Sequence, residues 1–368
     1  MPNSEMSSNI QLNSAQTPWD TTTLKNDTSW MYEFDEADRS ELLAALDFFK
    51  ADTKKTGLTA QWLHGHLTPS PDKFPLPRLD KVLKQFRHDL ENKFGIAMFK
   101  GFPVHELGGK DLQLLYAGFS SYIGTPRPQT VFGEFVQDIK DLGQSSLIER
   151  RGSKHNRGLG LHNDPCDVNG FLCVSGASSG GEGLFASSLA IHNALQETAP
   201  QHLKILYGNF HNTYQDYLFI KNGFNDELLP TEKVYSIPTF STEAGRLACR
   251  YSRFYIDQAQ ELPDIPRLTS IQLDALDAFE AELNNPKWHL EINYQPGDIV
   301  FSNNFICLHG RNPFTDDGNT ASPKRHLLRI WLTVTNSRPL SPNYRHYFFQ
   351  NLDAGAPRGG LPLPAINY

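Results

Sequence analysis

The chain has few cysteines, no long apolar run and no block of basic residues. No stretch approaches the 18 apolar residues that a membrane-spanning helix needs, and the N-terminus lacks the basic start and apolar segment of a secretory signal. The 34 Lys and Arg are outnumbered by 41 Asp and Glu and do not cluster. We therefore expect neither a membrane nor a nucleic acid as a partner.

The spacing of the four cysteines indicates the cellular compartment in which the protein folds. Cys166, Cys173, Cys249 and Cys307 lie far apart and form no Cys-x-x-Cys pair. This spacing argues against a disulfide framework and against a structural zinc site. Because free cysteines are typical of reducing compartments, we expect a cytoplasmic protein.

The composition and the predicted secondary structure change along the 368 residues. Residues 1–28 are rich in Asn, Ser and Thr and are predicted to be a flexible tail, followed by a single catalytic domain over 29–368. From about 130 to 350, short β-rich segments such as "GFLCVSGA" and "RLACRYSRFYI" are separated by Gly, Pro, Asn and Asp, which favours a sandwich or barrel. Apolar residues at helical spacing predict helices over 40–52, 77–95, 110–124, 188–208 and 269–285. The sequence thus predicts an α+β fold with a mainly β core.

Two histidines each stand two residues before an acid: His162-x-Asp164 in "GLGLHNDPCD" and His289-x-Glu291 in "KWHLEINYQPG". A strand places residues i and i+2 on one face, about 6.5 Å apart, so that either pair can chelate one ion. Spacing alone does not separate a metal pair from an ordinary hydrogen-bonded or solvated one. Both interpretations therefore stay open at this point.

Residues further along the chain favour the first pair. Two histidines and one carboxylate with open positions are the signature of non-haem Fe(II) oxygenases. The best third ligand is His309, in "DIVFSNNFICLHGRNPF", and Arg325 and Arg329 follow in "KRHLLRIW". At i and i+4 on an expected strand, these two arginines share a face, where they would be costly unless they bind anions.

Together, "LHND", "SSGGEG", "QPGDIVFSNNFICLHGRNPF" and "KRHLLRIW" resemble the iron- and 2-oxoglutarate-dependent dioxygenases of the taurine dioxygenase and clavaminate synthase type, over about residues 75–350. The resemblance implies a double-stranded β-helix, or jelly roll, flanked by N-terminal and inserted helices. It also implies that His162, Asp164 and His309 bind iron, and that Arg325 pairs with the distal carboxylate of 2-oxoglutarate. Arg329 matches a position that grips an anionic group of the substrate or supports the cosubstrate; a salt bridge to a nearby acid is the alternative.

The resemblance further implies a reaction. With Fe(II), 2-oxoglutarate and dioxygen, the enzyme would form succinate and carbon dioxide and remove a hydrogen atom from a substrate C–H bond, leading to hydroxylation, desaturation or oxidative cyclisation. We expect a small, carboxylate-bearing substrate, such as an amino acid or a secondary-metabolite precursor. Gln129, Phe132 and Phe135 are expected either to approach that substrate or to pack the sheet.

One position departs from the family pattern. Many members have a threonine directly after the Gly-Gly-acidic turn, and its hydroxyl helps to hold the cosubstrate, whereas this chain has Gly183. Another group or a water must then make that contact. Two other classes remain open: a metal-dependent hydrolase with zinc at the same triad, and a non-catalytic β-sandwich binding protein. The sequence does not indicate an oligomeric state.

Overall fold

Two β-sheets form the core of the computed structural model, which describes residues 16–58, 68–130, 133–141, 155–214, 233–316, 324–346 and 349–361. The larger sheet has the strand order β1-β2-β14-β6-β17-β3, and β4 also pairs with β17. The smaller sheet has the order β13-β8-β15-β5. Their bounds are β1 Met31–Glu33, β2 Ile96–Lys100, β3 Thr125–Arg127, β4 Val136–Lys140, β5 Leu159–His162, β6 Val168–Ser175, β8 Gly183–Ser187, β13 Leu290–Ile292, β14 Ile299–Asn303, β15 Cys307–Arg311 and β17 His326–Thr333.

Apolar side chains from both sheets meet between them. Cys173 and Val300 of the larger sheet pack with Phe185, Leu290 and Cys307 of the smaller one in a single buried cluster. All neighbouring strands within the two sheets run antiparallel except β1 and β2. Two antiparallel sheets enclosing one apolar layer agree with the expected jelly-roll core.

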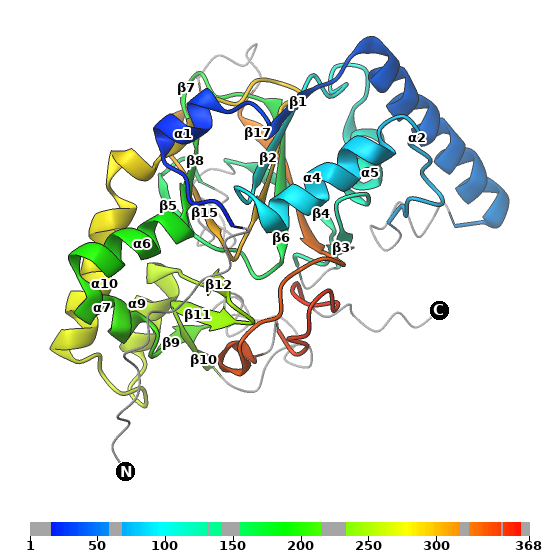
Figure 1. Ribbon diagram of the computed structural model, residues 1–368. Helices are drawn as coiled ribbons and strands as arrows, with labels where there is room; N and C mark the ends of the chain where they lie inside the picture. The colour runs from blue at the N-terminus through cyan, green and yellow to red at the C-terminus, as the bar shows by residue number, and fades with distance from the viewer. Residues whose placement is uncertain are drawn as a thin grey trace.

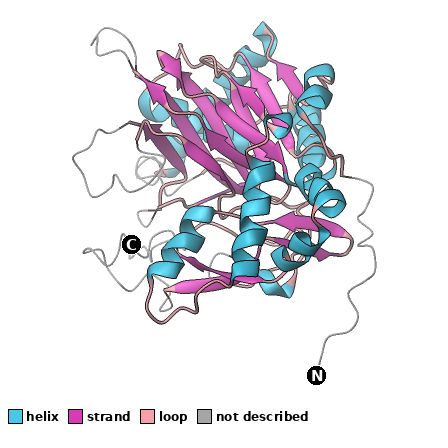
Figure 2. Ribbon diagram, turned by 90° about the vertical axis from the view of Figure 1, so that its left-hand side faces the viewer, coloured by secondary structure: helices cyan, strands magenta, loops and turns pink. Residues whose placement is uncertain are grey.

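Helices cover the outer faces of the two sheets (Figures 1 and 2). Helices α2, α4 and α5 pack against the larger sheet through a second apolar cluster, and α6, α7 and α10 lie on the opposite side of the core. Their bounds, with those of the remaining α-helices, are α1 Thr21–Asn26, α2 Glu36–Thr56, α4 Asp80–Asn92, α5 Gly109–Ser120, α6 Ser188–Thr198, α7 Pro200–Leu206, α9 Arg253–Glu261 and α10 Ser270–Leu283.

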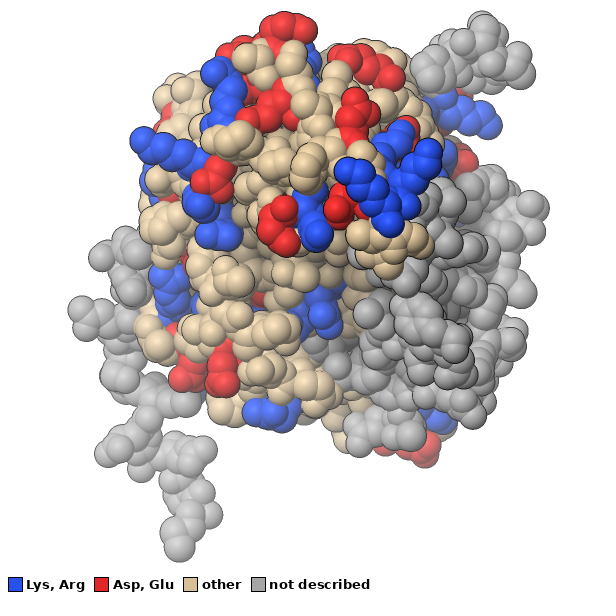
Figure 3. Space-filling model, turned by 90° about the vertical axis from the view of Figure 1, so that its right-hand side faces the viewer, with Lys and Arg blue, Asp and Glu red and all other residues tan. Residues whose placement is uncertain are grey.

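Short two-stranded sheets complete the architecture. They pair β7 Ser179–Gly180 with β16 Phe314–Thr315, β9 Asn209–Thr213 with β10 Val234–Pro238, and β11 Phe240–Glu243 with β12 Arg246–Cys249. In the part of the chain that the structure describes, no helix has the length and apolar character needed to cross a membrane. Basic and acidic side chains are intermixed on the face shown in Figure 3.

Three local expectations need correction. The segment 188–208 is two helices rather than one, because Pro200 lacks the N–H that a continuing helix would need and instead opens α7 at its first position. The segment "RLACRYSRFYI" begins as strand β12 but continues as helix α9. Within the expected tail, residues 21–26 form α1 and Trp19 is buried, donating its indole N–H to Phe94 O at 2.7 Å; residues 1–15 lie outside the described residues.

Candidate active site

Three side chains from neighbouring parts of the smaller sheet converge on one point. His162 ends β5, Asp164 follows it by two residues, and His309 lies on β15, paired in register with His162. One donor atom from each lies within 4.8 Å of the others. His162 Nε2 is 3.9 Å from Asp164 Oδ1, and His309 Nε2 is 3.6 Å from Asp164 Oδ2. Two imidazoles and one carboxylate in this arrangement are a suitable donor set for a divalent transition metal.

Asp164 is held by groups that the sequence motif does not contain. Its Oδ2 accepts a hydrogen bond from Arg329 Nη1 at 3.1 Å and another from Trp331 Nε1 at 2.8 Å. Its backbone N–H donates to Asn304 Oδ1 at 3.0 Å. Burial alone would raise the pKa of Asp164, but the Arg329 guanidinium and the hydrogen bond from Trp331 act against it, and the pKa is lowered. The carboxylate therefore stays ionised, as a metal ligand must be.

The two histidines are neutral around physiological pH. Burial lowers the pKa of both, and the pKa of His309 falls to about 3. His162 Nδ1 lies 2.8 Å from Gly160 O, a contact that requires the hydrogen on Nδ1 and leaves the Nε2 lone pair available. The amide nitrogen of Asn169 lies 3.1 Å from ring nitrogens of His309 and fixes that ring against the larger sheet. His162 is thus held in the tautomer that can donate to a metal through Nε2.

The residues after Asp164 are supported by the C-terminal segment. Asp167 Oδ1 accepts a hydrogen bond from Arg358 Nε at 2.6 Å, and both side chains are buried. Gly360 N donates to Pro165 O at 2.8 Å. A side chain at Gly359 would meet Pro165 O at 2.7 Å, so only glycine fits that close approach. Residues 358–360 therefore support the loop that carries Asp164.

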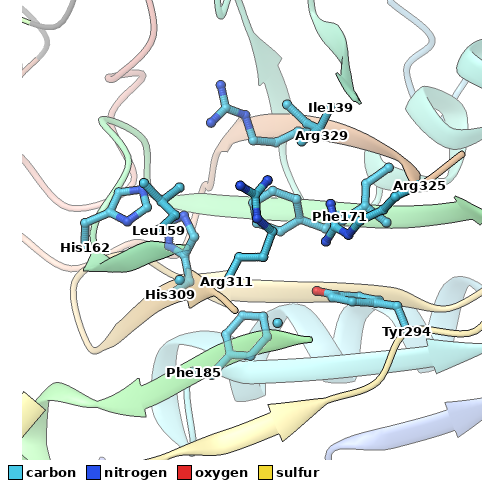
Figure 4. Close-up of a pocket in the computed structure, with 13 residues that line it drawn as sticks. Ile139, Leu159, His162, Phe171, Phe185, Tyr294, His309, Arg311, Arg325 and Arg329 are labelled. Atoms are coloured by element: carbon cyan, nitrogen blue, oxygen red, sulfur yellow. The ribbon is translucent and has the colours of Figure 1, made fainter. Parts of the chain in front are cut away.

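A pocket extends from the histidines to Arg325 (Figure 4). His162 and His309 lie at one end, and Arg325 and Tyr294 lie at the other. The pocket wall consists of Ile139, Leu159, His162, Phe171, Gly183, Phe185, Tyr294, His309, Gly310, Arg311, Arg325, Leu327 and Arg329. Most of these residues are apolar, and the charged ones are Arg311, Arg325 and Arg329. This composition is typical of a site for a small anionic ligand.

Arg325 offers its charge to the pocket. Its Nη2 donates to Gly181 O at 3.0 Å, and its guanidinium lies 5.0 Å from the centre of the Phe314 ring. Among the described residues, no carboxylate oxygen lies within 4.0 Å of this guanidinium. Burial lowers the pKa of Arg325, but an arginine keeps its charge. A buried guanidinium without an anionic partner is prepared to bind one.

Arg329 is occupied differently. Besides Asp164, its guanidinium donates to Gln129 Oε1 at 2.7 Å and to Gln137 Oε1 at 2.9 Å. Gln129 in turn donates to the backbone oxygens of Phe135 and Arg329, at 2.8 Å each. The structure thus contains the salt bridge that was the alternative for Arg329, although this side chain also borders the pocket.

The expected substrate contacts are only partly tested by this geometry. Gln129 and Phe135 are both buried, and neither is among the described residues that form the pocket wall. Their substrate role remains a prediction, while their packing in the sheet is plain. Phe132 lies outside the described residues. His289, the competing histidine, contacts Leu283 O through its ring and takes no part in the metal group.

Arg311 is a pocket residue that the sequence reasoning missed. It follows His309 by two positions on β15, so both side chains face the same side of the strand. Its Nη2 donates to the backbone oxygens of His155, at 2.6 Å, and Arg157, at 2.5 Å. Burial and neighbouring Arg325 lower its pKa to about 10. The sequence "HGR" could have indicated this role, because residues two apart on a strand face the same side and His309 was already expected to bind the metal.

Comparison with known proteins identifies the family. The model of the taurine catabolism dioxygenase TauD, TfdA family matches residues 61–331. The chain belongs to this family. It is therefore an iron(II)- and 2-oxoglutarate-dependent dioxygenase, and neither the hydrolase nor the non-catalytic alternative is supported.

Two curated relatives of this dioxygenase act in different organisms. FR-33289 synthase of Streptomyces rubellomurinus is 30% identical over 330 residues, which cover 87% of this chain and 90% of the relative. The taurine hydroxylase-like protein SAT17 of Stachybotrys chartarum is 28% identical over 312 residues, which cover 80% of this chain and 73% of the relative.

Solved structures share the fold of the dioxygenase. An asparagine oxygenase in complex with Fe(II), 3-hydroxyasparagine and succinate aligns with a TM-score of 0.58 at 16% identity, covering 82% of this chain and 93% of the other. The non-heme iron oxygenase OrfP in complex with Fe, succinate and hydroxy-L-Arg gives the same TM-score, identity and coverage. At this identity the likeness shows the fold, and the expected jelly roll is confirmed.

Proposed function

We propose that His162, Asp164 and His309 hold the iron of this dioxygenase, and that Arg325 holds the distal carboxylate of 2-oxoglutarate. One observation carries the proposal: the two histidines of the three-residue donor group border the same pocket as a buried guanidinium that has no anionic partner among the described residues. The donor set fits iron, because two neutral imidazoles and one ionised carboxylate leave coordination positions open for small ligands.

The protein side chains divide the work. When bound, iron with 2-oxoglutarate and dioxygen supplies the oxidising power that removes a substrate hydrogen atom, while 2-oxoglutarate becomes succinate and carbon dioxide. Arg329 and Trp331 keep the Asp164 carboxylate oriented through its Oδ2, which leaves Oδ1 for the metal. Phe171, Phe185 and Leu327 give the pocket an apolar wall.

We further propose a small, carboxylate-bearing substrate, either an amino acid or a secondary-metabolite precursor. The names of the relatives support this class: one makes FR-33289, and solved relatives contain hydroxylated asparagine or arginine. The outcome at the substrate carbon, hydroxylation, desaturation or cyclisation, depends on that substrate. The substrate role predicted for Gln129, Phe135 and Arg329 belongs to this proposal.

We also propose a cellular location and a domain organisation. All four cysteines are buried free thiols, which supports a cytoplasmic location. The helices that precede the β core pack directly on the larger sheet, which supports one catalytic domain. Because Trp19 and Leu24 also pack in the core, this domain begins before residue 29.

Succinate release tests the proposed function. The purified enzyme is loaded with iron(II) under anaerobic conditions, and succinate is measured with and without 2-oxoglutarate and dioxygen across a panel of amino and organic acids. We expect release that requires all three components and is lost in His162→Ala. Release that continues without iron, or iron binding by His162→Ala as tight as in the parent, would contradict the proposal. Metabolite depletion in cell extract then narrows the substrate.

A further inference from the structure

Gly183 is glycine for reasons of space and not of backbone conformation. Its φ is not among the positive values found at other glycines such as Gly180 and Gly181. A Cβ built at Gly183 would lie 2.7 Å from Cε2 of Tyr294 and 3.1 Å from Cε2 of Phe185. Real Cβ atoms essentially never come within 3.0 Å of another residue's atom, as the contact with Tyr294 would require. Tyr294 thus fills the volume that any side chain at position 183 would need.

The Tyr294 hydroxyl faces the same volume. Its oxygen lies 3.3 Å from the Cβ position at Gly183, where the family threonine would begin its side chain. The ring borders the pocket beside Arg325 (Figure 4). Within the described part of the chain, no hydrogen bond to this hydroxyl occurs. Burial raises the pKa of Tyr294, so the phenol keeps its proton and can donate it.

Arg325 and Tyr294 lie over neighbouring glycines. A Cβ at Gly181 would be 2.8 Å from Arg325 Nε, just as one at Gly183 would touch the Tyr294 ring. Two residues span at most about 7 Å of chain, so the guanidinium and the phenol stand side by side at the end of the pocket away from the histidines. A carboxylate between them would accept charge-assisted hydrogen bonds from both.

We propose that Tyr294, in the space left by Gly183, donates its phenolic hydrogen to the distal carboxylate of 2-oxoglutarate alongside Arg325. The inference rests on the proposed binding of the cosubstrate at Arg325. It assigns to a residue 111 positions away in the sequence the hydrogen bond that a threonine at position 183 would make. Glycine and tyrosine then form a matched pair, because position 183 has no room for a threonine while position 294 is a tyrosine.

Calorimetric titration of the anaerobic iron(II)-loaded enzyme tests the role of Tyr294. Two ligands are compared: 2-oxoglutarate, which has the distal carboxylate, and 2-oxobutyrate, which lacks it. Removing a hydrogen bond to a charged group by Tyr294→Phe should weaken 2-oxoglutarate binding about 10-fold or more and leave 2-oxobutyrate binding unchanged. Tyr122→Phe is the matched control, because that hydroxyl is bonded to Leu76 N and lies outside the pocket wall.

A rescue experiment separates the hydroxyl from the shape of the ring. Tyr294→Ala should weaken 2-oxoglutarate binding, and adding Gly183→Thr should recover part of it, because the alanine frees the space that threonine needs. Gly183→Thr alone should weaken binding by displacing the tyrosine. Iron stoichiometry and the melting temperature are measured for each variant to show that it is folded.

Three outcomes would overturn the inference. They are parent-like 2-oxoglutarate binding by Tyr294→Phe, equal weakening for both 2-oxo acids, and no recovery in the double variant. Failure of the parent enzyme itself to bind 2-oxoglutarate would instead overturn the proposed function, and this inference with it.

Discussion

Two buried arginines four residues apart are expected to respond differently to replacement by methionine in the metal-free enzyme. Arg329 donates to the Asp164 carboxylate at 3.1 Å, whereas no carboxylate oxygen of the described residues lies within 4.0 Å of the Arg325 guanidinium. Methionine keeps the apolar stem and removes the charge. Arg329→Met therefore leaves a buried carboxylate without its cation, while Arg325→Met removes a buried cation that forms no ion pair with the described residues.

The structure sets the size of the two effects on the free energy of unfolding. Removing one partner of a buried ion pair costs about 3–5 kcal/mol, and the bond from Trp331 to Asp164 keeps the loss for Arg329→Met near 3 kcal/mol. Arg325→Met loses one hydrogen bond, to Gly181 O, worth about 1 kcal/mol, and gains from no longer burying a charge. We expect it to change stability by less than about 1 kcal/mol.

Urea unfolding in the presence of a chelator measures both values, with equal m-values required for the comparison. Saturating iron(II) should then reduce the deficit of Arg329→Met, since the metal supplies positive charge beside Asp164. Arg325→Met should keep its stability but lose binding of 2-oxoglutarate. The reasoning is refuted if both variants lose the same stability, or if iron leaves the deficit of Arg329→Met unchanged.

Three further changes test the metal group, the thiols and the C-terminal support. His309→Ala should abolish stoichiometric iron binding, measured by elemental analysis. His289→Ala should bind iron as the parent does, because the His289 ring contacts Leu283 O and not the metal group. Loss of iron from both variants would contradict the assignment. All four thiols are buried, and burial raises the pKa of Cys173 to about 12, so its thiolate is scarce at pH 8. Iodoacetamide should therefore label no cysteine in the native enzyme and four in urea, as counted by mass spectrometry. Labelling of Cys173 in the native enzyme would refute this. Arg358→Met leaves the buried Asp167 carboxylate without its cation and should lower the free energy of unfolding by about 3–5 kcal/mol. A loss under about 1 kcal/mol in urea unfolding would show that this ion pair does not stabilise the fold.

The parts of the site that could be predicted are those encoded in short stretches. His162 and Asp164 are two residues apart, and the strand of His309 follows a recognisable turn, so local sequence and the resemblance together place them. The segments that form α2, α4, α5 and α10 show apolar residues at helical spacing in the sequence. The end of α6 depends on Pro200 and was not predicted.

The rest of the site depends on contacts between distant segments. Trp331 is an apolar strand residue by pattern, and only the crossing of β17 beside Asp164 shows its hydrogen bond. Gln129 was expected either near a substrate or in the packing of the sheet, and only the structure shows its contact with Arg329, 200 residues later. Tyr294 follows the short strand β13, and nothing local indicates that it faces Gly183. Side-chain partners across a sheet are set by register and twist, which one sequence does not reveal.

The support from residues 358–360 has a consequence for the order in which the enzyme matures. The chain is synthesised from its N-terminus, so His162 and Asp164 leave the ribosome well before His309. Asp167 acquires its partner Arg358 only after 191 further residues have been synthesised. The nascent chain therefore has no complete metal group for much of its synthesis. The loop that carries Asp164 therefore gains its full support only after the segment around Arg358 has folded onto the core.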